Sequence, residues 1–331
     1  MKLATLDDGS RDGQLAVVSR DLKIAHIADA ICPTLQAALD DWAFIAPQLA
    51  ALYTQLNDGD TRRHFDFDPS RCLAPLPRAP SRASAQAYLH RLELERRAYG
   101  ADLPPSLLEQ PLMTPSAGVA LGAHADVNLA HEEWGIDFGA GVAVILDDVP
   151  MGATPDEAHG CIRLLMLAND ITLRMLAIDE QERDAGLLQA APATGFSPVA
   201  VTPDELGDAW RGAKLHGRIR SGINGNAFGQ PDAGVDMAFN FAQLAAHLCQ
   251  TRTLGAGTVL GAGPVSNKAP TRRGAAPPGA GCIAEQRSRE AILDGGPATP
   301  YLRFGDTVRI EMLDEQGKSI FGAIEQTLTK P

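Results

Sequence analysis

Residues 68–83, with the sequence DPSRCLAPLPRAPSRA, contain four prolines in sixteen residues. Proline lacks the backbone N–H that helices and central strands require, so this stretch can only be an extended connector. It divides the 331 residues into a short and a long part. We therefore predict a small N-terminal domain over residues 1–75 and a larger C-terminal domain over residues 76–331.

Both parts contain patterns of regular structure. Residues 2–21 predict two strands turned at an Asp/Gly/Ser cluster, and residues 34–56 have the apolar spacing of a helix. Helical patterns also cover 86–100 and 239–254, and the tetrapeptide TPDE, at 154 and again at 202, is typical of a helix start. Strand patterns fill 118–150, a hairpin around Asn224-Gly225 and a second hairpin over 303–328. The expected fold class is α+β, mostly β, with a Gly/Pro-rich loop over 271–281 that could border an active site.

Composition narrows the range of functions. The net charge is -12 and the pI is near 5.1, without a Lys/Arg cluster, which disfavours a nucleic acid or an anionic membrane as partner. No window resembles a secretion signal or a membrane span, so we expect a cytoplasmic protein that acts on a small molecule. The 5 cysteines are scattered and form no C-x-x-C pair, which argues against disulfides and zinc and favours buried apolar roles.

Three segments invite a chemical reading. The glycines over 254–263 have the wrong spacing for a dinucleotide fingerprint and favour ordinary turns. His124, His131, Glu132 and Glu133 could be metal ligands, but solvated loop groups are the favoured interpretation. Asp170 ends the long apolar run LMLAND, where a carboxylate must be paired, capped or metal-bound. A structural cap and a functional role remain open for it.

A set of longer motifs is similar to one known family. WGIDF and VAVI around 134–145, RLLMLANDITLR at 163–174, GTVLGAGPVSNK at 257–268, CIAEQR at 282–287 and TPYLRFGDTVRIEMLD at 299–314 resemble the fumarylacetoacetate hydrolase superfamily, in particular its bacterial two-domain members. The resemblance implies an SH3-like N-terminal domain, a C-terminal mixed β-roll that carries the site, and a homodimer. It also implies Mg²⁺ or Ca²⁺, because the family acts on β-diketo and 2-keto acids whose oxygens are hard ligands.

This sequence departs from the family's four metal-binding carboxylates. The strand motif E-x-E is replaced by Gly139-Ala140-Gly141. The family's aspartate after the connector, which is the third ligand, falls on Ser84 here, so Asp170 alone remains of the four ligands. The family's histidine seven residues later falls on Arg91. One carboxylate cannot hold these ions against water, and we therefore predict no metal and no other cofactor.

Several of the family's proton-transfer groups are also replaced in this sequence. The lysine expected two residues after Gln189 is Ala191, and Pro264 replaces a threonine. His90 lies one residue before the expected histidine, which rotates it by about 100° on a helix. The predicted catalytic residues are Asp170, Glu285, Arg174 and His90. The predicted substrate-binding positions are Ser84, Arg91, Gly139, Gly141, Gln189, Ala191 and Lys268.

The losses gather at the site, whereas caps, turns and apolar runs are kept. We expect a roomier, less acidic pocket at the two glycines. One hypothesis is an enzyme repurposed for a metal-independent reaction on a larger carbonyl-bearing or polyketide-like molecule, in which holding one conformer supplies much of the rate. The alternative is a non-catalytic paralogue that binds a ligand or pairs with an active subunit. Residual acylpyruvate hydrolysis is the least favoured reading.

Overall fold

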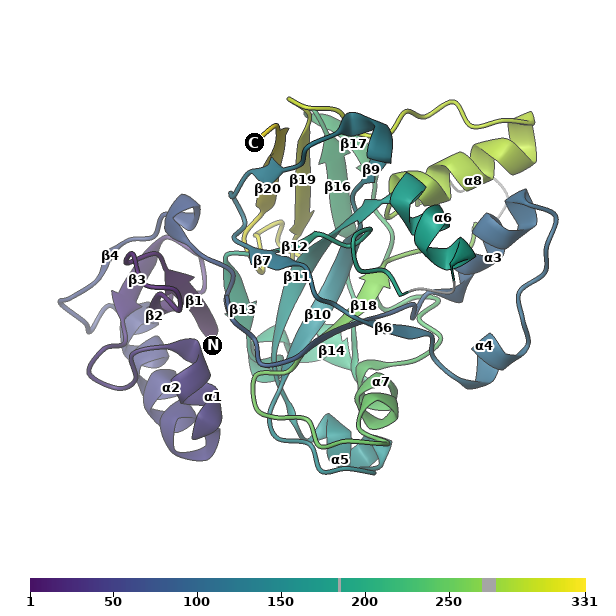
Figure 1. The fold of residues 1–331 in the computed structure, drawn as a ribbon. Helices are drawn as coiled ribbons and strands as arrows, with labels where there is room; N and C mark the ends of the chain where they lie inside the picture. The colour runs from purple at the N-terminus through teal and green to yellow at the C-terminus, as the bar shows by residue number, and fades with distance from the viewer. Residues whose placement is uncertain (184–185, 270–277) are drawn as a thin grey trace.

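The computed structural model describes residues 1–183, 186–269 and 278–331 (Figure 1). Most of the loop predicted over 271–281 therefore lies outside the described residues. Within the described part of the chain, no helix is long and apolar enough to cross a membrane.

The N-terminal domain consists of four short antiparallel strands and two helices. The elements are β1 (Lys2–Leu6), β2 (Gln14–Val18), β3 (Ile24–Ile27), α1 (Leu35–Asp40), α2 (Trp42–Asp58) and β4 (Phe65–Asp66). The β1–β2 hairpin is the predicted one. The single helix predicted over 34–56 is instead two helices, because Asp41 leaves the helical conformation (φ -138°, ψ 50°) and separates α1 from α2.

The 3-10 helix η1 (Pro69–Arg71) lies at the start of the proline-rich connector, and the C-terminal domain contains the remaining elements. Its helices are α3 (Leu89–Ala98), α4 (Ser106–Glu109), η2 (Glu132–Trp134), α5 (Pro155–His159), α6 (Arg174–Glu182), η3 (Pro203–Ala209), α7 (Phe241–Leu248) and α8 (Ile283–Asp294). Its first strands are β5 (Arg82–Ala85), β6 (Met113–Pro115), β7 (Val119–Leu121), β8 (Val127–Asn128), β9 (Ile136–Asp137), β10 (Ala140–Leu146), β11 (Ile162–Leu173) and β12 (Ala193–Phe196). The others are β13 (Val199–Val201), β14 (Trp210–Arg211), β15 (Lys214–Leu215), β16 (Ile219–Ile223), β17 (Asn226–Gly229), β18 (Val259–Pro264), β19 (Thr307–Met312) and β20 (Ile324–Thr329).

One large sheet runs through both domains in the order β4-β3-β2-β1-β13-β11-β10-β18-β5-β6. The domains join where β1 pairs antiparallel with β13. A second sheet, with the strand order β17-β16-β19-β20-β8, lies entirely in the C-terminal domain. The helices α3, α6 and α8 lie on the side of the molecule away from the N-terminal domain (Figure 1). The fold is mixed and mostly β, as expected.

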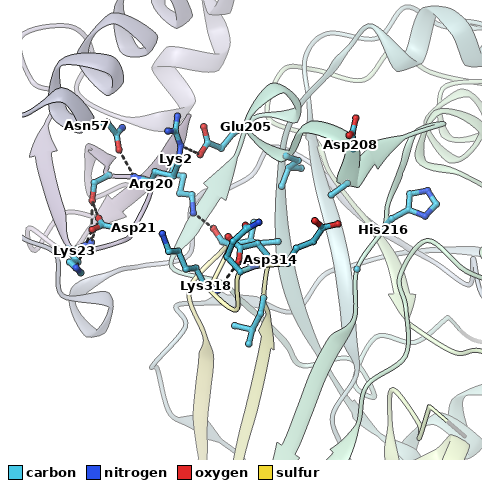
Figure 2. Close-up of a pocket in the computed structure, with 18 of the residues that line it drawn as sticks. Lys2, Arg20, Asp21, Lys23, Asn57, Glu205, Asp208, His216, Asp314 and Lys318 are labelled. Atoms are coloured by element: carbon cyan, nitrogen blue, oxygen red, sulfur yellow. Dashed lines mark hydrogen bonds and ion pairs between the residues drawn. The ribbon is translucent and has the colours of Figure 1, made fainter. Parts of the chain in front are cut away.

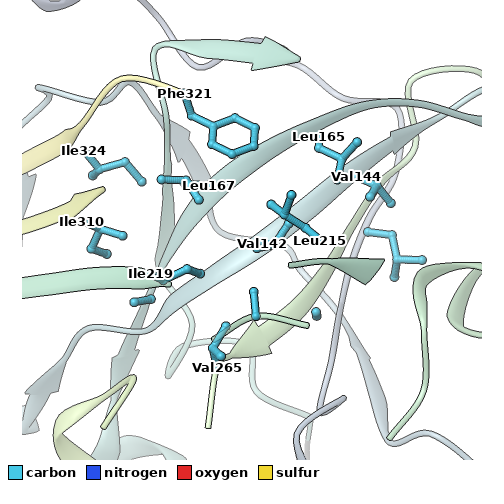
Figure 3. Packing of buried hydrophobic residues seen from close by; sticks show 14 of the residues in the cluster. Val142, Val144, Leu165, Leu167, Leu215, Ile219, Val265, Ile310, Phe321 and Ile324 are labelled. Carbon is cyan, nitrogen blue, oxygen red and sulfur yellow. The ribbon is translucent and has the colours of Figure 1, made fainter. Parts of the chain in front are cut away.

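The central strands β10 and β11 are buried on both faces, which is why they read as continuous apolar runs. On one face, Val142, Val144, Leu165 and Leu167 pack against residues of the second sheet such as Ile310 (Figure 3). On the other face, alternate residues of the same strands join a core shared with the N-terminal domain. This second face carries the candidate site at its far end.

Several local predictions are confirmed. Thr154 and Glu157 form the reciprocal cap of α5, and Asn224 and Gly225 both have positive φ in the turn between β16 and β17. The second TPDE begins the 3-10 helix η3 rather than an α-helix, since Gly207 interrupts it (φ 51°, ψ -131°). All five cysteines are free, and four of them are buried.

Candidate functional site

Asp170 lies near the end of β11, and its carboxylate accepts from two hydroxyl groups of neighbouring strands. Oδ2 lies 3.4 Å from Oγ of Ser84 on β5, and Oδ1 lies 3.2 Å from Oγ1 of Thr194 on β12. The pairing of β5, β18, β10 and β11 brings these strands together. Ser84 and Asp170 therefore meet as two members of the predicted site, and Thr194 joins them.

Burial disfavours the charged form of Asp170. Burial raises the pKa of this carboxyl above its ordinary value, against the bonds from Thr194 and Ser84 and the charges of Arg82 and Arg91. Its neighbour Asn169 is fully buried: Oδ1 accepts from N–H of Gly139 (3.2 Å), and Nδ2 donates to Gln326 on β20 (3.0 Å). Asn169 therefore links the backbone at Gly139 to β20, whereas Asp170 contacts Ser84 and Thr194.

The space beside Gly139 and Gly141 is filled, which corrects the expectation of a roomier pocket there. A Cβ on Gly139 would lie 2.8 Å from Cγ of Pro264 and 3.3 Å from Cβ of Asp170. A Cβ on Gly141 would lie 2.7 Å from the carbonyl oxygen of Gly263. The glycines permit close packing of β10 against β18 and β11, which is one of the ordinary reasons for glycine in a strand.

Arg174 and Arg91 belong to a buried chain of alternating charges behind the site. Arg174 at the start of α6 donates to Oδ2 of Asp137, with Nη2 2.7 Å away. Glu95 of α3 lies between the two arginines, 3.8 Å from Arg174 Nη1 and in direct contact with Arg91. Gln86 accepts from the other Nη of Arg91. Both guanidinium groups therefore have protein partners already.

Asp137 also anchors α8. Its carboxylate accepts from the backbone N–H groups of Ile283 (2.7 Å) and Ala284 (3.0 Å), at the positive end of the helix dipole. The side chain is fully buried, so its charge depends on these donors and on Arg174. The sequence WGIDF gave no sign of this role.

Glu285 is held in a second buried group on α8. It accepts from Oγ of Ser266 (2.8 Å) and from N–H of Gly281 (3.1 Å), and pairs with Arg289. Burial raises its pKa, although Arg289 and these donors act against the rise. Its exposed fraction is 0%, so Glu285 is enclosed by partners rather than open to a ligand.

His90 lies on α3 and faces α8. Its Nδ1 is buried, lies 3.7 Å from Oε2 of Glu93, and has no hydrogen-bond partner among the described residues. Burial and the charge of Arg289 lower its pKa. The charged groups that act on it include Lys268, whereas Asp170 is not among them.

The other predicted positions lie further out. Gln189 is exposed, and its N–H donates to Glu180 (2.8 Å). Lys268 is exposed, whereas Ala191 is half-buried. His124, His131 and Glu133 are exposed, as the favoured interpretation predicted. Glu132 is an exception, because its Oε1 accepts from N–H of Phe304 (2.7 Å).

A cavity of about 1060 Å³ lies elsewhere, between the two domains (Figure 2). Its walls combine both signs of charge, including the Arg20–Glu205 ion pair (3.0 Å) and the nearly buried Lys2, whose Nζ donates to the carbonyl of Ile320 (2.7 Å). Burial lowers the pKa of Lys2 to about 8. None of the predicted site residues lines this cavity.

The donor set does not fit the family's metal ion. Among residues 1–183, 186–269 and 278–331, no group of three or more His, Cys, Asp or Glu side chains could hold one. The Asp170 carboxylate instead has two hydroxyls beside it. Hydroxyls and one carboxyl are too few charges for tight binding of Mg²⁺ or Ca²⁺.

Family models match nearly the whole chain. The fumarylacetoacetase N-terminal domain 2 matches residues 1–78, and the fumarylacetoacetate hydrolase C-terminal domain matches residues 85–329. No curated protein matches. The two matches are separated by residues 79–84.

Solved structures share the fold at low identity. A fumarylacetoacetate hydrolase from Exiguobacterium antarcticum is 17% identical over 100% of both chains, with a TM-score of 0.65. A 5-carboxymethyl-2-hydroxymuconate delta-isomerase from Mycobacterium smegmatis is 15% identical over 100% of both chains, with a TM-score of 0.60. A 2-hydroxyhepta-2,4-diene-1,7-dioate isomerase from Mycobacterium marinum is 16% identical over 78% of each chain, with a TM-score of 0.51. These relatives are named as hydrolases or isomerases.

Proposed function

Because the chain belongs to the fumarylacetoacetate hydrolase family, we propose that it is an enzyme whose site performs a metal-independent cyclisation, isomerisation or lyase reaction. Its substrate is a carbonyl-bearing, polyketide-like small molecule. We also propose that the protein acts as a homodimer. The family match supports the enzyme, and the changed donor set supports the loss of the metal.

The observation that carries this proposal is the environment of Asp170. It is the carboxyl group beside Gly139, it accepts hydrogen bonds from two hydroxyls, and burial raises its pKa. A carboxyl group whose pKa is raised is a better proton donor site than an ordinary surface carboxylate, and its conjugate base is a stronger proton acceptor. Glu285 and Arg174, in contrast, are engaged with protein partners.

The chemistry needs one carboxyl group and two proton transfers. Asp170 donates its proton to a carbonyl oxygen, which makes the attached carbon more electrophilic. The resulting carboxylate then removes a proton from a carbon next to a carbonyl, and the acid is restored. Ser84 and Thr194 hold the carboxyl in one orientation through both steps, and the bound conformer sets which carbon reacts.

The non-catalytic paralogue remains the second candidate. The filled space at Gly139 and Gly141 favours it, because the neighbourhood of Asp170 is tighter than a site with two vacated side chains would be. A binder performs no turnover, so the wild-type protein would then convert none of the candidate substrates. The two candidates therefore separate on turnover by the wild-type protein.

The test uses linear 3,5-diketo esters as substrates, with EDTA present and products identified by mass spectrometry. The wild-type protein should convert at least one of them, and Asp170→Asn should slow conversion by about 10²-fold or more. Asp179→Asn, an exposed change on α6, is the matched control and should be neutral. A requirement for added Mg²⁺, or one tightly bound divalent ion per chain, would contradict the proposal. Full turnover by Asp170→Asn would exclude Asp170 as its acid.

A further inference from the structure

Four arginines lie among the predicted site residues or in contact with their neighbours, and three of them are paired with carboxylates. The pairs are Arg91 with Glu95, Arg174 with Asp137, and Arg289 with Glu285. Their charges are therefore compensated inside the protein. The fourth, Arg82, differs: within the described part of the chain, its Nη1 is buried and has no hydrogen-bond partner.

Arg82 lies two residues before Ser84 on β5, and side chains two apart on a strand share a face. Ser84 is the residue whose Oγ lies 3.4 Å from Asp170. The side chain of Arg82 is thus on the same sheet face as the carboxyl group of the site. It is partly exposed, so the enclosed Nη1 belongs to a group that a ligand can still reach.

A buried donor without a partner is costly, and native proteins keep few of them. Asp170 accepts from Ser84 and Thr194, and no hydrogen bond among the described residues joins it to Arg82. The charge of Asp170 opposes the lowering of the pKa of Arg82 by burial, but it leaves Nη1 without a hydrogen-bond partner. An anion that entered beside Asp170 would supply that partner.

We propose that Arg82 is the anion-binding residue of this site and that it binds the enolate of a 1,3-dicarbonyl compound. The inference rests on the proposed function and names the class of substrate for it. A guanidinium presents parallel N–H donors, which match two oxygens of a planar, delocalised anion. In the related enzymes a metal ion would supply positive charge to such an anion. The described residues here include no group of three or more His, Cys, Asp or Glu that could hold one, and Arg82 supplies the positive charge instead.

The probe is 2-acetylcyclohexane-1,3-dione, a small triketone that is an enolate at pH 7. Its control ligand is 2-acetylcyclohexanone, which has the same ring and acetyl group but is neutral at that pH. Binding is measured by calorimetry and by the ultraviolet difference spectrum of the enolate, with EDTA present. The wild-type protein should bind the triketone with a Kd on the order of 1 mM or tighter, and the neutral ligand more weakly.

Arg82→Met should weaken triketone binding by about 10-fold or more, the loss of hydrogen bonds to a charged group. Arg82→Lys keeps the charge without the fork and should restore part of the affinity. Arg303→Met removes an exposed arginine and is the matched control. Thermal melting verifies that each variant is folded. Wild-type affinity in Arg82→Met, or equal affinity of the wild-type protein for both ligands, would overturn the inference.

The result is separable from that of the proposed function. If Asp170→Asn abolishes turnover while Arg82→Met binds the triketone like the wild-type protein, the inference fails and the proposed function stands. If Arg82→Met loses the triketone while Asp170→Asn keeps full turnover, the anion site stands and the role of Asp170 fails.

Discussion

Gly139→Ala tests whether the space beside this glycine is filled. An added Cβ would lie 2.8 Å from Cγ of Pro264 and 3.1 Å from the backbone oxygen of Asp170. Overpacking of this kind costs about 1–3 kcal/mol. Replacement of a glycine by alanine returns about 0.4–1 kcal/mol, because the unfolded chain loses freedom. We expect Gly139→Ala to lower the free energy of unfolding by about 0.5–2 kcal/mol.

The measurement is urea denaturation followed by tryptophan fluorescence, with the midpoint compared at constant m. Gly255→Ala is the matched control, because a Cβ there meets nothing within 4 Å. Pro264→Ala removes the nearest obstacle, so the double variant Gly139→Ala/Pro264→Ala should be more stable than the sum of the two single effects predicts. The backbone oxygen of Asp170 remains, so the relief is partial. Equal effects of Gly139→Ala and Gly255→Ala would refute the close packing.

Three further outcomes are expected. Gly139→Glu/Gly141→Glu should gain neither Mg²⁺ binding by calorimetry nor acylpyruvate hydrolysis, because both Cβ positions are blocked and the other ligands are missing; recovered turnover would contradict this. Burial raises the pKa of folded Asp170 above 3.8, so the protonated carboxyl is favoured in the folded protein relative to the unfolded chain. The contribution of this proton to stability is complete below pH 3.8 and is lost as the pH rises through the folded pKa. Asp170→Asn should therefore be more stable than wild type at pH 8 and lose that advantage near pH 3, and a pH-independent difference would count against it. Asp137→Asn should lower the free energy of unfolding in urea by about 3–5 kcal/mol, because Arg174 loses its buried partner. The exposed substitution Glu133→Gln is the control and should leave the free energy of unfolding unchanged. Similar losses of stability for both variants would exclude a stabilising role of the buried pair.

Local signals predicted local structure well. The Thr154 cap and the Asn224-Gly225 turn depend on residues near one another in sequence, and both are confirmed. The break at Asp41 was missed, because apolar spacing continues across it. The apolar runs of β10 and β11 gave the buried centre of the fold.

The site was only partly predictable. Asp170 stood out as a carboxyl at the end of an apolar run, and the family register placed Ser84 beside it. Thr194 could not be found, because its contact depends on how β12 pairs with β11, a long-range register that the sequence does not encode locally. Arg82 was missed for a related reason. It stands out because its buried Nη1 has no hydrogen-bond partner among the described residues, and only the three-dimensional structure shows this. Pro264 was noticed as a replacement, but its contact with Gly139 was not.

The pairing of β1 with β13, at Lys2 with Val201, Leu3 with Ala200 and Ala4 with Val199, has a practical consequence. The connector separates two domains in sequence, yet the main-chain ladder passes from one to the other. A fragment that began after the connector would leave one side of β13 as a bare strand edge, with apolar residues on both of its faces. Such edges recruit other chains and promote aggregation. In the whole chain β1 covers this edge of β13, so the small domain keeps the edge from pairing with other chains.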